Sequence, residues 1–173
     1  MTRSFIDHTL ETAPAAARVA LTETKQKFGK IPSPIARLAA SPLALPAVLT
    51  GLETFEHSSL TPLEREVLAM TMGRKNDCHY CVNLHRRLLR LIDAPPAVCE
   101  ALEHGTPLAI PKLEALRTFI LSALEHTGNV PAPVWAQFLG AGFDHANALE
   151  VIVGISAYTL TTFANRLTEA PLD

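Results

Sequence analysis

Apolar residues recur along this chain at intervals of three and four, which is the period of an amphipathic α-helix. Prolines and glycines divide the pattern into short blocks, and several blocks begin with a serine or threonine followed by proline, a common helix start. Helices are expected over residues 12–28, 34–40, 42–57, 111–127, 131–139 and 144–163, with two more between 61 and 92 and one between 93 and 105. No segment alternates with the period of two that indicates a strand. The sequence therefore predicts an all-α helical bundle with one domain over residues 1–173.

The first of these helices is expected to bury one face, and the last is expected to be buried on most of its surface. The helix over 12–28 should end at Gly29. Its expected buried face consists of Ala16, Val19, Ala20 and Phe28. The last helix contains the run ALEVIVGISAYTL, residues 148–160, which is apolar on nearly all sides. Such a helix is typical of a central position or of an interface between subunits.

The stretch from Thr61 to Ile92 holds the residues with the most distinctive chemistry. Cys78 and Cys81 form a C-x-x-C, and His85 follows four residues after the second cysteine. A helix that starts at Cys78, with Asp77 as its N-cap, places both cysteines and His85 on one apolar face. The arginines of the same helix fall on the opposite face, so we expect the thiols to point into the protein.

A thiol attacks as its thiolate, which a helix N-terminus and a nearby imidazolium both favour. Both cysteines lie in the first turn of the predicted helix, but only Cys81 has a histidine one turn after it. We therefore expect Cys81 to attack and Cys78 to resolve the product as a disulfide. The helix dipole alone would favour Cys78, and that order stays open.

Two glutamates precede the cysteines on the neighbouring predicted helix. Thr61, Pro62 and Glu64 have the spacing of a capping box, so Glu64 is expected to cap the helix. Glu66 lies beside an apolar stripe, where a carboxylate is costly unless it is paired. We predict that Glu66 pairs with His85, directly or through water, and that the pair passes protons to and from the thiols.

The pattern E-x11-C-x-x-C-x-x-x-H resembles the AhpD-like, carboxymuconolactone-decarboxylase superfamily, most of all its peroxidase-related alkylhydroperoxidase branch. Two further stretches support the resemblance, FGKIPSPIARLAASP (28–42) and ANRLTEAPLD (164–173). It implies an all-helical fold, trimers or hexamers, and a redox-active disulfide, with no cofactor expected. It also implies a lipoyl-protein or thioredoxin-like dithiol as reductant, and the apolar stripe suggests a small organic hydroperoxide as substrate.

The resemblance also implies a role for each residue of the motif. Glu66 corresponds to the relay glutamate and His85 to the relay histidine. Cys81 corresponds to the cysteine that becomes a sulfenic acid, and Cys78 to the one that donates a proton and forms the disulfide. The best-known members carry a histidine immediately before the second cysteine, where this chain has Tyr80. Tyr80 is therefore a candidate for the substrate pocket or the proton relay.

The amino-acid composition indicates which binding partners and which cellular location to expect. Hydrophobic residues make up 48% and charged residues 18%, less than the usual charged share of about 25%, which favours apolar surface buried in a homo-oligomer. The net charge of −2 favours neither nucleic acid nor an anionic membrane. No apolar run approaches the length of a membrane span, and the first residues lack the apolar stretch of a secretory signal. We therefore expect a cytoplasmic protein, in which a C-x-x-C is catalytic or metal-binding.

Two other functions use the same residues. An enzyme of the carboxymuconolactone-decarboxylase type would transfer protons through histidine or glutamate without the cysteine pair. A non-enzymatic helical oligomer could sense redox state, or bind zinc through the two cysteines and His85. A structural zinc site needs a fourth ligand, and His79 should point away, so we expect no metal. Cys99 is expected to be a small buried residue rather than a redox thiol.

Overall fold

Within residues 5–172, which the computed structural model describes, all regular structure is helical. The elements are η1 (Ala15–Ala17), α1 (Arg18–Phe28), α2 (Ser33–Leu38), α3 (Ala44–Glu56), α4 (Pro62–Lys75), α5 (His79–Leu91), α6 (Pro96–His104), α7 (Pro111–Glu125), α8 (Ala132–Gly140) and α9 (His145–Leu167). The predicted all-α class is confirmed. Every predicted helix is present, although several begin or end a few residues away from the expected position.

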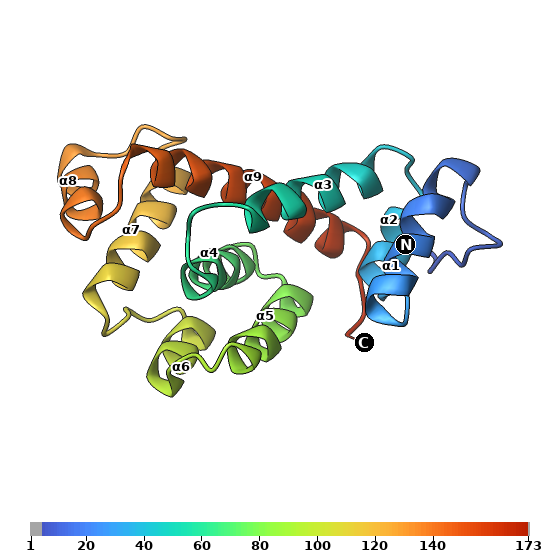
Figure 1. The fold of residues 1–173 in the computed structure, drawn as a ribbon, viewed down its shortest axis with the longest axis horizontal. Coiled ribbons are helices and arrows are strands. Elements are labelled where there is room, and N and C mark those ends of the chain that lie inside the picture. The colour runs from blue at the N-terminus through green and yellow to red at the C-terminus, as the bar shows by residue number, and fades with distance from the viewer. Residues whose placement is uncertain (1–4, 173) are drawn as a thin grey trace.

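Helix α9 runs across the molecule from α8 to the region of α1 and α2 (Figure 1). Helices α3 and α4 pack along it, and α2 lies near its C-terminal end. A Cβ atom at Gly154 would lie 2.6 Å from a ring carbon of Phe55 on α3 and 2.7 Å from a methyl carbon of Leu68 on α4. The missing side chain at Gly154 therefore allows three helices to meet at close range.

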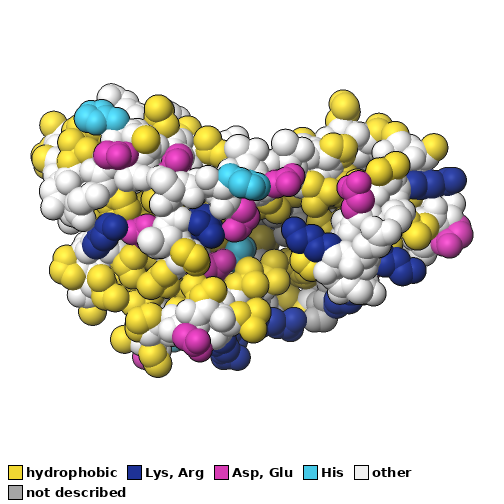
Figure 2. Space-filling view, viewed as in Figure 1, with side chains coloured by type: hydrophobic (Ala, Val, Ile, Leu, Met, Phe, Trp, Pro, Cys, Tyr) yellow, Lys and Arg dark blue, Asp and Glu magenta, His cyan; other side chains and the backbone are white. Residues whose placement is uncertain are grey.

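By length and composition, α9 is also the one helix in the described part of the chain that could cross a membrane. One helix of this kind does not show that the protein spans a membrane, because the core helix of a soluble protein has the same length and composition. The face drawn in Figure 2 carries many apolar side chains between charged groups of both signs.

Two clusters of buried side chains hold the helices together. The larger one lies among α4, α7, α8 and α9 and includes Met70, Leu116, Phe119, Phe138 and Val151. The smaller one joins η1, α1, α2 and α3 and consists of Ala13, Ala17, Leu21, Leu38, Ala39, Leu45 and Val48. Leu52 on α3 packs against both clusters.

The predicted buried face of the first helix is wrong for three of its four residues, since only Ala20 is partly buried and packs against the smaller cluster. Val19 and Phe28 are 67% and 58% exposed, and Ala16 is exposed as well. The buried residues of this segment are instead Ala17, Leu21 and Thr24. The predicted helix end is confirmed, because Gly29 follows α1 in the left-handed conformation that favours glycine.

Helix α4 begins with the predicted capping box. The Thr61 side chain accepts from the Glu64 N–H at 3.3 Å, and Glu64 Oε2 accepts from the Thr61 N–H at 2.8 Å. Glu64 Oε1 also lies 2.7 Å from Lys112 Nζ on α7. Burial by itself would raise the pKa of Glu64, but the hydrogen bonds from Lys112 and Thr61 hold it below its ordinary value of 4.5. Glu64 is therefore a structural carboxylate that joins α4 to α7.

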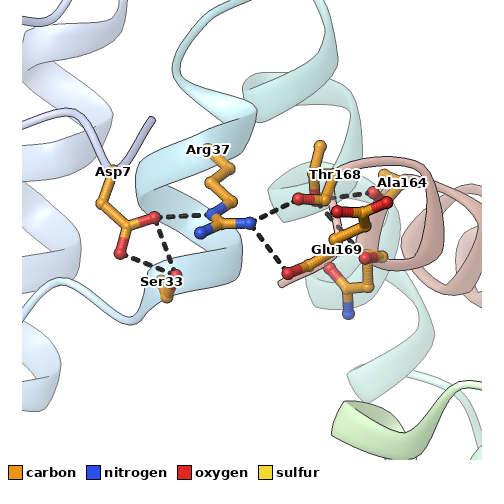
Figure 3. A network of polar contacts seen from close by, with 7 residues as sticks. Asp7, Ser33, Arg37, Ala164, Thr168 and Glu169 are labelled. Carbon is orange, nitrogen blue, oxygen red and sulfur yellow. Dashed lines mark hydrogen bonds and ion pairs between the residues drawn. The ribbon is translucent and has the colours of Figure 1, made fainter. Parts of the chain in front are cut away.

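Arg37 on α2 joins the N-terminal segment to the chain that follows α9 (Figure 3). Its Nε lies 2.6 Å from Asp7 Oδ1, and its Nη1 donates to the carbonyl oxygens of Thr168 and Glu169. Ser33 Oγ donates to the same Asp7 carboxylate at 2.8 Å. Burial alone would raise the pKa of Asp7, but the hydrogen bonds from Arg37 and Ser33 hold it below its ordinary value of 3.8. This network holds the Glu169 backbone, and Glu169 lines a cavity that Cys78 also lines.

Candidate active site

The two cysteines of the C-x-x-C lie where α4 turns into α5, and they are joined by a disulfide. Their Cα atoms are 5.3 Å apart, which is an ordinary separation for this bond. Both residues are almost fully buried, at 2% and 3% exposed. The backbone therefore already holds Cys78 and Cys81 within bonding reach of each other.

Helix α5 is capped by Cys78, and the prediction that Asp77 is the cap is wrong. Cys78 Sγ accepts from the Cys81 N–H at 3.3 Å. Asp77 instead ends α4 in the left-handed region, with φ at 51°, and the Cys78 N–H bonds back to the Gly73 carbonyl at 2.8 Å. The Asp77 carboxylate pairs with Arg166, with 3.2 Å between Asp77 Oδ2 and Arg166 Nη1. The Cys78 sulfur consequently lies at the positive end of the α5 dipole.

The predicted contact between the glutamate and the histidine is present. His85 Nδ1 lies 2.8 Å from Glu66 Oε2, and both side chains are mostly buried. The imidazole also packs edge-on against the ring of Tyr158 on α9, with 5.3 Å between the ring centroids. Burial raises the pKa of Tyr158, and the nearby Glu66 raises it further, so the phenol stays neutral. These contacts fix His85 one turn after Cys81 on the same face of α5.

Asn165 on α9 is a site residue to which sequence reasoning gave no role. Its Nδ2 lies 3.4 Å from Cys81 Sγ and 4.0 Å from Cys78 Sγ. Asn165 is 5% exposed, and its Oδ1 is buried without a hydrogen-bond partner. Asn165 follows Tyr158 by seven residues and therefore shares its helix face, but the sequence does not show that this face reaches the cysteines.

A cavity of about 280 Å³ opens beside the disulfide. It is lined by Asp77, Cys78, His79, Tyr80, Asn165, Arg166, Glu169 and Ala170. Cys78 is thus part of its wall, whereas Cys81 is not among its lining residues. Tyr80 lies at the cavity, while its part in proton transfer stays a prediction. The side chain of His79 is 84% exposed and lies 3.8 Å from Asp77.

Residues outside this centre add no further thiol or metal chemistry to it. Cys99 on α6 is a free, partly buried cysteine whose Sγ lies 3.7 Å from the Ala94 carbonyl oxygen. Burial raises the pKa of the Cys99 thiol, and Glu103 adds to this effect. Among residues 5–172, no three or more His, Cys, Asp or Glu side chains are grouped so that they could hold a metal ion.

Comparison by sequence gives no relative, because neither a protein-family model nor a curated protein matches the chain. Solved structures do match. An uncharacterized peroxidase-related protein with an alkylhydroperoxidase AhpD core, from Ralstonia eutropha JMP134, has 21% identity and a TM-score of 0.84, covering 98% of this chain and 91% of its own. An uncharacterized peroxidase-related protein from Silicibacter sp. TM1040 has 18% identity and a TM-score of 0.79, covering 100% and 95%.

A third solved structure, of a protein of unknown function from Agrobacterium tumefaciens that carries the name AhpD, has 17% identity and a TM-score of 0.63. It covers 78% of this chain and 94% of its own. At such low identities the likeness concerns the path of the backbone rather than the reaction. The chain therefore has the fold of the AhpD-like, peroxidase-related proteins, as the resemblance of its motif implied.

Proposed function

We propose that this protein is a thiol-dependent peroxidase that reduces small organic hydroperoxides through Cys78 and Cys81. The observation that carries the proposal is the buried pair of Glu66 and His85, at 2.8 Å, on the two helices that meet at the cysteines. A structural disulfide needs no acid–base pair beside it. A redox disulfide does, because protons move each time the bond forms or breaks.

The first half of the reaction oxidises the protein. The Cys81 thiolate attacks the terminal oxygen of the hydroperoxide, the O–O bond breaks, and an alkoxide leaves, to which His85 gives a proton. Cys81 is then a sulfenic acid. His85, now neutral, takes the proton of the Cys78 thiol. The Cys78 thiolate attacks the sulfenic sulfur and expels hydroxide, which takes this proton from His85 and leaves as water. Glu66 holds the imidazole in place and balances its charge during these transfers.

The second half restores the thiols. One thiolate of an external dithiol attacks the disulfide and forms a mixed disulfide, and the second thiol of the donor then releases the protein cysteine. The donor leaves as its own disulfide. The cavity beside Cys78 is the route by which we expect the donor to reach the bond. We propose a lipoyl group or a thioredoxin-like protein as this donor.

Counting thiols before and after one equivalent of cumene hydroperoxide tests the function. The reduced protein has three cysteines, and we expect two thiols to disappear with only Cys99 remaining. Cys99→Ser, the matched control, should also lose two. Cys81→Ser should fail to consume peroxide, whereas Cys78→Ser should stop at a sulfenic acid that dimedone traps. Full retention of the thiols in the wild type would refute the function. A sulfenic acid trapped by dimedone at Cys78 of the Cys81→Ser variant would show that Cys78 attacks first.

We also propose that the protein forms a homo-oligomer through the outer side of α9. Large apolar side chains are exposed there at spacings of three and four, the pattern of a helix–helix seam. They are Leu149, Ile152, Val153, Leu160, Phe163 and Leu167, each at least 39% exposed. An open groove of about 770 Å³ lies at the C-terminal end of this row, beside Ala44 of α3.

Phe163→Glu is expected to dissociate the oligomer, because it places a charge within the apolar seam, beside the groove at its C-terminal end. Light scattering coupled to size-exclusion chromatography measures the mass directly. Val19→Glu is the matched control, since Val19 is a similarly exposed apolar residue on α1. A wild-type mass of one chain, or the same loss of mass in both variants, would rule out this interface.

A further inference from the structure

We propose that Asn165 is a catalytic residue of this centre: its Nδ2 donates a hydrogen bond to the Cys81 thiolate, and its Oδ1 accepts the O–H of the hydroperoxide. The inference rests on the proposed peroxidase function and names the group that holds the substrate. Three observations support it, namely the distances to the two sulfurs, the unpartnered oxygen, and the position of Asn165 in the wall of the cavity.

The donor half follows from the distances at the two sulfurs. The Asn165 amide nitrogen is closer to Cys81 Sγ, at 3.4 Å, than to Cys78 Sγ, at 4.0 Å. The Cys78 sulfur already has a backbone donor, the Cys81 N–H at 3.3 Å. The Asn165 amide is therefore the nearer donor to Cys81 Sγ, whereas Cys78 Sγ has the backbone N–H as well as the longer contact with Asn165. A hydrogen bond to a charged acceptor is stronger than one to a neutral acceptor, so this donor favours the thiolate of Cys81.

The acceptor half follows from the other end of the same amide. Asn165 Oδ1 is buried and has no partner, although an unpaired buried acceptor costs about 1–3 kcal/mol. An orphan polar atom of this kind calls for an explanation, and Asn165 lines the cavity beside the disulfide. A hydroperoxide carries one O–H, on the oxygen that the thiolate attacks. Bound to Oδ1, this O–H would bring that oxygen next to the sulfur to which Nδ2 donates.

The bond changes are compatible with this arrangement. The S–O bond forms and the O–O bond breaks, so the thiolate is oxidised and the hydroperoxide is reduced to an alkoxide. The proton on the attacked oxygen stays there, because the product is S–O–H. Asn165 Oδ1 therefore accepts the same O–H before and after the step. The alkoxide takes its proton from His85.

Charged or titratable side chains reach this centre from each element around it. They are Glu66 from α4, Asp77 from the turn, His79, Tyr80 and His85 from α5, Tyr158 and Arg166 from α9, and Glu169 from the chain after α9. The amide of Asn165 does not titrate. Its replacement by another neutral residue consequently leaves these charges in place, and a change in the titration of Cys81 reports the lost donor.

The test compares two reagents in a Cys78→Ser, Cys99→Ser background, where Cys81 is the one remaining thiol of the three. Iodoacetamide reports the thiolate, and cumene hydroperoxide reports the thiolate and the acceptor together. Asn165→Leu should raise the pKa of Cys81 and slow alkylation at neutral pH about tenfold, which equals about one pKa unit. Above that pKa alkylation should recover, whereas the reaction with hydroperoxide should stay at least tenfold slower.

Asn165→Asp keeps the size and the acceptor oxygen but loses the donor. It also adds a negative charge, so it should raise the pKa of Cys81 by more than Asn165→Leu does, and it should keep more of the hydroperoxide rate above that pKa. Asn76→Leu is the control, because Asn76 donates to Thr162 of α9 at 2.8 Å and no hydrogen bond joins it to either sulfur. We expect Asn76→Leu to match the parent with both reagents.

The outcomes separate this inference from the function on which it rests. Unchanged profiles in both Asn165 variants, or an equal change in Asn76→Leu, would overturn the role of Asn165 while the peroxidase function stands. A parent protein that does not react with hydroperoxide would overturn the function and the acceptor role. In that case a shifted alkylation profile would still support the donor role.

Discussion

Glu66→Gln is expected to slow the reaction of the reduced protein with an organic hydroperoxide by about a hundredfold or more, within the range of general acid–base catalysis. Glu66 Oε2 lies 2.8 Å from His85 Nδ1, and no other ion pair to this imidazole is present among the described residues. A glutamine amide can still bond to the ring, but it cannot balance the charge of an imidazolium. The imidazole would then be a weaker source of the proton that the alkoxide needs.

A double-mutant cycle measures whether the two residues act as one unit. His85→Gln should cost about as much as Glu66→Gln, and the double variant should be no slower than the slower single variant, because groups that act together are not additive. Single-turnover kinetics in a stopped-flow instrument give the rate constants. Losses that multiply in the double variant would show that the two residues act independently.

Glu64→Gln is the matched control for this cycle. Glu64 lies on the same helix and is somewhat more buried, with 6% of its side chain exposed against 12% for Glu66, but it bonds to Thr61 and Lys112. Glutamine also serves in a capping box, so the helix start should persist while the ion pair with Lys112 is lost. We expect a less stable protein whose reduced form reacts with hydroperoxide at close to the wild-type rate.

Gly154→Ala is expected to lower the free energy of unfolding by about 1–2 kcal/mol. Alanine is the better helix former by about 1 kcal/mol, but its methyl group would lie 2.6 Å from the Phe55 ring and 2.7 Å from Leu68. Both neighbours are fully buried and cannot move without disturbing the core, and overpacking typically costs about 1–3 kcal/mol or more. Gly154→Val should destabilise the protein further.

Thermal and denaturant unfolding measure this effect, with an expected fall in midpoint of about 2–4 °C for each kcal/mol. Gly140→Ala is the control, since Gly140 is also helical and has no atom within 4 Å of an added Cβ. It should leave stability unchanged or raise it slightly. Equal effects at the two glycines would mean that the contact of α9 with α3 and α4 is looser than the distances indicate.

Local signals in the sequence predicted the features that depend on neighbouring residues. The capping box of Glu64 and the helix ends at Gly29 and Gly105 are set within a few residues of each position. The pairing of Glu66 with His85 could also be predicted, because a carboxylate in an apolar stripe needs a partner and the next helix offers one. The all-α class followed from the same periodicity.

Features that depend on how helices meet could not be predicted in this way. Asp77 was predicted to be the N-cap of α5. It instead has the left-handed conformation in the turn after α4, and Cys78 is the N-cap. The 3-10 turn η1 precedes α1, and its tighter winding shifts the buried face toward Ala17 and Leu21. Asn165 is 84 residues from Cys81 in the chain, so no local pattern could join them.

Two adjacent residues near the end of α9 face different parts of the molecule. Ala164 packs against the smaller cluster formed by the N-terminal helices, and Asn165 reaches the sulfurs. Arg37 donates hydrogen bonds to the carbonyl oxygens of Thr168 and Glu169, which follow these two residues. A chain without its first forty residues would keep every sulfur, imidazole and carboxylate of the centre. The end of α9 that carries the Asn165 amide would lose its contacts with the N-terminal helices and with Arg37. A version of the protein shortened in this way would thus show altered thiol reactivity, although the deletion removes no reactive group.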